Sequence, residues 1–145
     1  MDWKREAADK LRVYQARKDS LASIAEEIKR LTDEATSIRS ATTDGTPVSG
    51  GSSTREDRLV NSIAKRQELQ LTYKITRSLV KQVDTALAAL DEEEQLVLDR
   101  FYIHRAKGNV QRLCDELCVE QSSAYRRRDS ALRHFTIALY GMVEV

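Results

Sequence analysis

The densest group of side chains that could do chemistry lies at residues 121 to 128, which read Gln-Ser-Ser-Ala-Tyr-Arg-Arg-Arg. Amide and hydroxyl groups hydrogen-bond the edges of bases, arginine binds guanine or neutralises phosphate, and tyrosine donates to a phosphate oxygen. Asp129 is the only acidic residue between residue 121 and Phe135, so the local charge is positive. These residue types, taken together, predict nucleic-acid recognition.

The arginine run also has a second interpretation, a solvated helix surface that binds nothing. Consecutive residues of a helix point about 100° apart, so the three arginines cannot share one face. We therefore expect either Arg127 or Arg128 to lie along the domain core with its aliphatic stem buried.

Three short helices are predicted to position these side chains, at about Glu92 to Ile103, Val110 to Cys118 and Gln121 to Tyr140. Asp91 can cap the first helix, and the acids after it favour the positive end of that helix. Only a few residues join the last two helices, which predicts a helix-turn-helix whose second helix can lie in the major groove of DNA. The predicted apolar core of this domain consists of Leu96, Val97, Phe101, Tyr102, Leu113, Cys114, Leu117, Val119, Ala124, Ala131, Leu132, Phe135 and Leu139.

A long helix is predicted before this domain, because from Trp3 to Ile38 the apolar residues recur at alternating spacings of three and four. Lys10 and Arg17 interrupt this stripe. Neither Pro nor Gly occurs between Trp3 and Ser40, so one uninterrupted helix is the simplest interpretation.

A second long helix is predicted from about Arg55 to Ala89, after a polar segment at residues 42–54 that contains the only Pro and most of the Gly. We interpret that segment as a flexible loop. Each long helix would measure about 50 to 60 Å, and their matched lengths favour an antiparallel coiled-coil hairpin. The predicted seam consists of Leu21, Ile24, Ile28, Leu31 and Ile38 with Leu59, Ile63, Tyr73, Val80 and Leu87. A second stripe, expected to face another chain or the C-terminal domain, consists of Leu71, Ile75, Leu79, Val83 and Leu90.

The sequence therefore predicts an all-α protein with two domains. Residues 1–90 would form the hairpin, which we expect to build a homo-oligomer. Residues 91–145 would form the helix-turn-helix domain.

Other functional classes find little support in the sequence. There is no glycine-rich phosphate loop, and His104 and His134 lie far apart, so we expect no enzyme, cofactor or small-molecule substrate. Cys114 and Cys118 are too few for a zinc site, and we interpret both as buried apolar residues. No apolar run is long enough for a membrane span and no signal-peptide core follows the charged start, so we expect a soluble protein of the cytoplasm.

The residues from Leu90 to Tyr102, followed later by Ala131-Leu132, resemble the promoter-recognising fourth region of bacterial sigma factors. The chain is more closely similar to the ArpU/RinA type of phage late-gene transcription regulators. That similarity extends through Ala124-Tyr125-Arg126 and Leu139-Tyr140-Gly141, and includes the upstream hairpin with its loop.

The resemblance implies an activator of phage or prophage late genes in a bacterial host cell, which binds double-stranded promoter DNA with its last helix and touches bacterial RNA polymerase. By position, Gln121, Ser122 and Arg126 match base-reading sites and Tyr125 a backbone-contacting site. Four further residues are candidate phosphate contacts: Ser123, Arg127, Arg128 and Arg133.

The chain departs from the pattern of these families at two positions. Glu120 stands where such helices usually begin with Ser or Thr, and Arg127 stands where an apolar residue is common. Ser122 could therefore be the cap of the last helix instead.

Two rival functions remain open. The small subunit of a phage terminase also combines a helix-turn-helix with coiled-coil helices, and assembles rings for genome packaging. A protein-binding adaptor would use the hairpin to hold a partner, and its terminal helices would be structural only.

Overall fold

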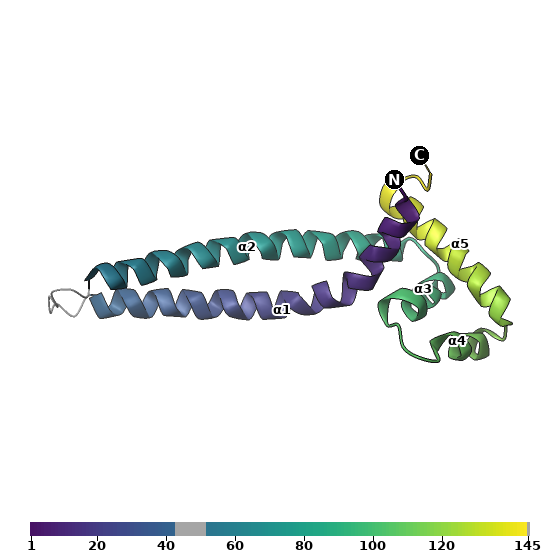
Figure 1. The fold of residues 1–145 in the computed structure, drawn as a ribbon, viewed down its shortest axis with the longest axis horizontal. Coiled ribbons are helices and arrows are strands. Elements are labelled where there is room, and N and C mark those ends of the chain that lie inside the picture. The colour runs from purple at the N-terminus through teal and green to yellow at the C-terminus, as the bar shows by residue number, and fades with distance from the viewer. Residues whose placement is uncertain (43–51, 145) are drawn as a thin grey trace. The chain divides into compact units, whose positions relative to one another are not determined.

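The computed structural model describes residues 1–42 and 52–144, and every regular element in these ranges is a helix. The all-α prediction is therefore confirmed. Two long helices, α1 (Trp3–Thr42) and α2 (Ser52–Ala88), come first (Figure 1). They are followed by α3 (Glu92–Leu98), the π-helix η1 (Asp99–Ile103), α4 (Asn109–Leu117) and α5 (Gln121–Tyr140). No helix in the described part of the chain is both long and apolar enough to cross a membrane.

The long helices extend further toward each other than the sequence predicts. Thr42 ends α1, and residues 52–54 already belong to α2. The rest of the predicted flexible loop, residues 43–51, lies outside the described residues.

The contacts divide the chain into two compact units, which differ from the predicted domains. Unit 2 comprises residues 19–77, and unit 1 comprises residues 1–18 together with residues 78–145. The beginning of α1 and the end of α2 thus belong to the same unit as the short helices. Aromatic and polar side chains connect these segments. The rings of Trp3 and Tyr140 lie 4.8 Å apart, and the hydroxyl of Tyr14 donates to the carboxylate of Asp84.

Unit 2 is an antiparallel helix pair with its apolar seam between the helices. Leu31, Ala35 and Ile38 of α1 are buried, and Leu21, Ile24 and Ile28 are half-buried. The hydroxyl of Ser62 donates to the carbonyl oxygen of Leu31 at 3.3 Å, which fixes the register of the two helices. The seam of α2 in this unit consists of Leu59, Ser62, Arg66, Leu69, Tyr73 and Thr76, with Ile63 half-buried beside it.

The residues of the second stripe of α2 differ in how much of their surface is exposed. Leu71 and Ile75 are 59% and 53% exposed, whereas Val83, in unit 1, is 2% exposed. The burial of Val83 in unit 1, which contains the short helices, agrees with the expectation that this stripe faces the C-terminal domain. Whether another chain covers Leu71 and Ile75 stays a prediction.

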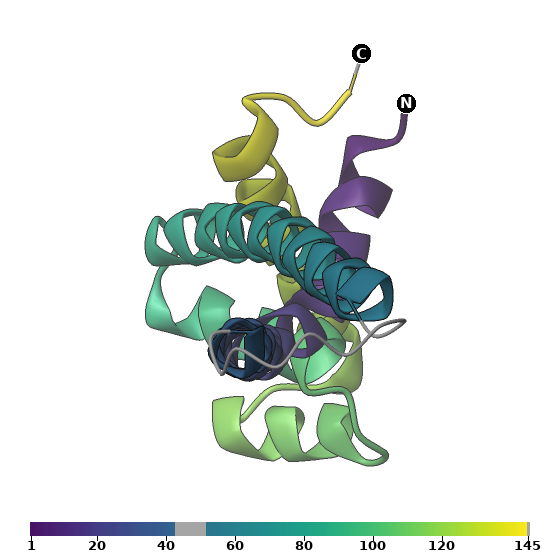
Figure 2. The same ribbon diagram turned by 90° about the vertical axis from the view of Figure 1, so that its left-hand side faces the viewer.

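In unit 1 the short helices enclose a small apolar core. Phe135, Leu98, Leu113 and Val97 are at most 1% exposed, and Leu98 is a core residue that the sequence pattern did not indicate. The beginning of α1 and the end of α5 lie side by side (Figures 1 and 2). This core fixes the orientation of α5, the helix that carries the arginine run.

Candidate nucleic-acid interface

A three-residue turn, Cys118 to Glu120, joins α4 and α5. Cys118 has φ 54° and ψ 47°, the left-handed conformation that glycine adopts most easily. The amide of Val119 donates to the carbonyl oxygen of Cys114 at 3.1 Å, which closes the end of α4. This is the helix-turn-helix connection that the sequence predicts, and α4 lies beside the start of α5 (Figure 2).

The first residue of α5 is Gln121, as predicted, and Glu120 is its N-cap. The backbone of Glu120 is extended, but its side chain makes no capping hydrogen bond. Ser122 lies inside the first turn, so it does not act as the cap.

The predicted base-reading residues lie on the solvent side of α5. Gln121, Ser122 and Arg126 are exposed, whereas Ala124, in the same turn, is fully buried. The buried face of this helix continues through Ala131, Leu132, Phe135 and Thr136, so the apolar core fixes the opposite side of α5. The exposed face near residue 121 is therefore free to meet a ligand.

The arginines of the run differ in their surroundings. Arg127 makes an ion pair with Glu93 of α3. The guanidinium of Arg128 lies 4.9 Å from the ring centre of Tyr125 and 5.4 Å from that of Phe101, and it pairs with Asp129. Arg128, with 30% of its side chain exposed against 41% for Arg127, is therefore the arginine that lies along the domain.

The remaining candidate phosphate contacts also differ. Ser123 is half-buried, and Arg133 is exposed on the later part of α5. The surface along the beginning and middle of α5 is therefore polar and positively charged.

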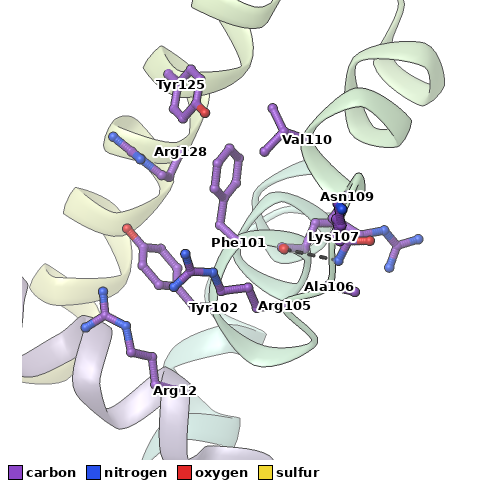
Figure 3. Close-up of a pocket in the computed structure, with 11 residues that line it drawn as sticks. Arg12, Phe101, Tyr102, Arg105, Ala106, Lys107, Asn109, Val110, Tyr125 and Arg128 are labelled. Carbon is purple, nitrogen blue, oxygen red and sulfur yellow. Dashed lines mark hydrogen bonds between the residues drawn. The ribbon is translucent and has the colours of Figure 1, made fainter.

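A basic pocket lies beside this surface, and the sequence did not predict it (Figure 3). It has a volume of about 650 Å³. Its lining includes Tyr125 and Arg128, which were predicted as phosphate contacts, and Figure 3 shows both near Phe101. Its cations are Arg12, Arg100, Arg105, Lys107 and Arg128, and its aromatic residues are Phe101, Tyr102 and Tyr125.

Phe101 and Tyr102 belong to the π-helix η1, whose carbonyl groups are held by a side chain of the next helix. The wider turn of a π-helix leaves carbonyl groups without their usual partners. Here the buried side chain of Asn109 donates to the carbonyl oxygens of His104 at 2.6 Å and Arg100 at 3.4 Å. No local sequence signal marks this turn, because its stability depends on an asparagine from the next helix.

Tyr102 is a half-buried residue at one wall of this pocket. Burial raises the pKa of its hydroxyl, and the nearby guanidinium groups of Arg128 and Arg12 lower the pKa in part. The guanidinium of Arg12 lies 5.4 Å from the ring centre of Tyr102. Tyr102 therefore contributes an uncharged ring at neutral pH.

The acidic residues at the start of α3 have a structural role. Asp91 accepts from the amide of Glu94 at 2.8 Å, and the amide of Asp91 donates back to the Glu94 side chain at 3.4 Å, so the predicted cap is confirmed. Glu94 also pairs with His134 of α5. These acids hold α3 and α5 together.

The two cysteines do not share one environment. Cys114 is buried, as predicted, but Cys118 is exposed, so the prediction that both are buried was wrong. Cys118 is exposed because it lies in the turn after α4 and not within the helix. Among the described residues no group of three His, Cys, Asp or Glu side chains could hold a metal ion.

Comparison with known proteins gives no family for this chain: no family model matches it, and neither a curated protein nor a solved structure does.

Proposed function

We propose that this protein is a sequence-specific DNA-binding transcription regulator, which reads double-stranded DNA with the helix that begins at Gln121. One observation carries the proposal: Gln121, Ser122 and Arg126 share the exposed side of the second helix of a helix-turn-helix, while the apolar core fixes the opposite side. The second helix of this motif places its N-terminal residues against base edges in the major groove.

The chemistry of the exposed residues fits this role. Arg126 can bind guanine through two hydrogen bonds, and Gln121 can bind adenine in the same manner. Arg133 adds a positive charge further along the helix, where phosphates of the backbone would pass. Arg127 already has a carboxylate partner, Glu93, so we assign it a smaller share of DNA binding than the sequence suggested.

The biological setting we propose is activation of phage or prophage late genes, with contact to bacterial RNA polymerase. This part rests on the resemblance to the ArpU/RinA type of regulators and to the fourth region of sigma factors.

The experiment that tests DNA reading compares Arg126→Ala with Lys29→Ala, which removes an exposed cation from α1 in unit 2. Genome-wide occupancy of the tagged protein first supplies the binding site. Fluorescence anisotropy then measures binding to that site and to random duplex. We expect Arg126→Ala to weaken specific binding by about 1 to 3 kcal/mol, random binding to fall much less, and Lys29→Ala to change neither.

An equal loss on both duplexes would make Arg126 a phosphate contact rather than a base reader. The occupancy profile separates the rival functions. A sharp peak upstream of late genes supports the regulator, and a peak at a packaging site together with a ring-shaped oligomer supports the terminase subunit. Absence of any peak supports the protein-binding adaptor.

A further inference from the structure

We propose that the basic pocket of unit 1 binds a nucleoside di- or triphosphate. This proposal concerns a free small molecule, and its ligand binding does not depend on the DNA-reading role proposed above. Three features of the pocket support it: its positive lining, an uncapped helix end and a set of aromatic rings.

The lining of the pocket contains five cationic side chains and no acidic one. Carboxylates that lie outside the lining pair with three of these cations: Asp9 with Arg12, Asp99 and Glu116 with Arg100, and Asp129 with Arg128. Arg105 and Lys107 are exposed and form no ion pair within the described parts of the chain. These two side chains are therefore the ones available for a polyphosphate.

The N-terminus of α4 adds to the positive field. Asn109 and Val110, the first two residues of α4, both line the pocket. The N-cap is Gly108, which has no side chain to accept a hydrogen bond from the first turn. The amide of Asn109 already donates to the carbonyl oxygen of Ala106 at 3.2 Å, so the amides of Val110 and Gln111, together with the dipole of this nine-residue helix, favour an anion at this position.

The aromatic residues give the site a second chemical character. The rings of Phe101 and Tyr125 lie 5.5 Å apart, and those of Phe101 and Tyr102 lie 6.5 Å apart (Figure 3). Rings and guanidinium planes are the groups on which nucleobases stack, and that stacking tolerates any base. An inorganic phosphate cannot stack on these rings. A ligand that carries both a base and phosphates therefore fits the lining best.

The size and form of the pocket favour a free nucleotide over the DNA backbone. A volume of about 650 Å³ falls in the range of small-molecule sites, roughly 300 to 1,000 Å³. The bases of a DNA duplex stay stacked within its helix, so they would not reach the rings of this pocket.

Two pocket residues, Tyr125 and Arg128, belong to α5, the helix that also carries Gln121 and Arg126. If the proposed DNA-reading function holds, a bound nucleotide would change DNA affinity, since both ligands contact the same helix. This regulatory consequence rests on the proposed function, whereas nucleotide binding itself does not.

The experiment is isothermal titration of the full chain, without DNA, with ATP, GTP and inorganic pyrophosphate. We expect either nucleotide to bind at least about tenfold more tightly than pyrophosphate, because stacking adds to the phosphate contacts. The double variant Arg105→Ala with Lys107→Ala should weaken nucleotide binding by about tenfold or more, because it removes two charge-assisted contacts. The matched control is Arg112→Ala, which removes an exposed cation of α4 that does not line the pocket.

Other results would overturn the proposal. Equal affinity for pyrophosphate and nucleotides would make the pocket a site for simple anions only. No binding of any of the three probes, with loss of duplex binding in the double variant, would make it part of the DNA interface. A loss of nucleotide binding as large in Arg112→Ala as in the double variant would show that general surface charge, not the pocket, attracts the ligand.

Discussion

Cys118 occupies the most demanding backbone position of the helix-turn-helix. Its φ of 54° is the only positive value among the non-glycine residues that the structure describes. An L-residue in this conformation is less stable by about 1 to 2 kcal/mol, because its Cβ approaches the following carbonyl oxygen. The exposed thiol offsets little of this destabilisation, since its contact with the carbonyl oxygen of Asp115 is long, at 3.8 Å.

We therefore expect Cys118→Gly to stabilise the protein by about 1 kcal/mol, because glycine reaches the left-handed region without this crowding. Thermal unfolding followed by circular dichroism measures the effect. Cys118→Ala serves as the control, because it removes the thiol but keeps the Cβ, and it should give no such gain. Equal stabilisation by both variants would contradict a backbone origin.

At this scale the sequence predicted the bounds of α5 well but not the partners of its arginines. Arginine spacing alone showed that Arg127 and Arg128 must differ. Which of them lies along the domain depends on Glu93 and on the rings of Phe101 and Tyr125, which come from other elements. The pocket was missed for the same reason, since Arg12 is far from the other lining residues in the sequence.

The stability of α3 depends strongly on the cap at its N-terminus, because this helix has only seven residues. Its capping box satisfies the amide groups of Asp91 and Glu94, since the first amide groups of any α-helix lack partners within the helix. We expect Asp91→Ala to destabilise unit 1 by about 1 kcal/mol, measured by urea unfolding. Glu92→Ala changes an exposed acid in the same turn that makes no capping bond, and it should have a much smaller effect. Similar losses in the two variants would assign the effect to charge near the helix end rather than to the cap.

Tyr14 and Asp84 connect the beginning of α1 to the end of α2 within unit 1. Burial of Tyr14, and then its hydrogen bond to the Asp84 carboxylate, raise the pKa of the tyrosine from 10.0 to about 12. A raised pKa means that the neutral hydroxyl is favoured in the folded state. The stability that it contributes is therefore complete below pH 10.0 and is lost as the pH rises toward about 12.

The Tyr14→Phe variant tests this pH dependence. At neutral pH it should lose about 1 kcal/mol of stability, the usual contribution of one hydrogen bond. In a tyrosinate absorbance titration, the step near pH 12 that belongs to Tyr14 should disappear. Tyr73→Phe, at a half-buried tyrosine of unit 2, is the control and should leave that step in place. A step near pH 12 that survives in Tyr14→Phe would refute the assignment.

Helix positions were largely predictable because glycine, proline and capping residues mark the ends. The π-helix η1 was not, because Asn109 of the following helix stabilises it. The seam of α2 was predicted only in part: Ser62 is buried and Leu69 is half-buried, and neither was assigned to it. The cause is physical, since apolar residues lie on opposite faces of α2 and the sequence alone does not show which face meets α1.

For the whole molecule, the prediction of an all-helical chain holds, but the boundary at residue 90 does not match the division of contacts. The ends of both long helices contribute Trp3 and Val83 to unit 1, where Trp3 meets Tyr140. The interruptions of the apolar stripe at Lys10 and Arg17 do not by themselves show where one unit ends. The boundary between the units follows only from contacts between side chains that are far apart in the sequence.

The outer face of α2 in unit 2 suggests how copies of the chain could associate. Val60, Leu71 and Ile75 are more than half exposed and, with Ala64, share the face opposite the seam. An antiparallel pair of such faces, centred near residue 67, would set Val60 of one copy against Ile75 of the other and Ala64 against Leu71. The stripe is thus complementary to itself, as a twofold dimer requires.

We therefore predict a homo-oligomer, and at least a dimer, held by this face of α2. Leu71→Glu combined with Ile75→Glu should reduce the mass to that of a monomer, because it places acidic groups in the apolar contact. Sedimentation velocity measures the mass of each variant.

The control adds the same charge beside the stripe, through Gln70→Glu combined with Thr72→Glu, and should preserve the oligomer because both residues are exposed and lie on the flanks. Circular dichroism of both double variants establishes that α2 remains helical. A monomeric wild-type chain at high concentration would refute the prediction directly. An oligomer that survives the Leu71 and Ile75 changes would show that another surface joins the copies, and the exposed stripe would then be available to a different protein.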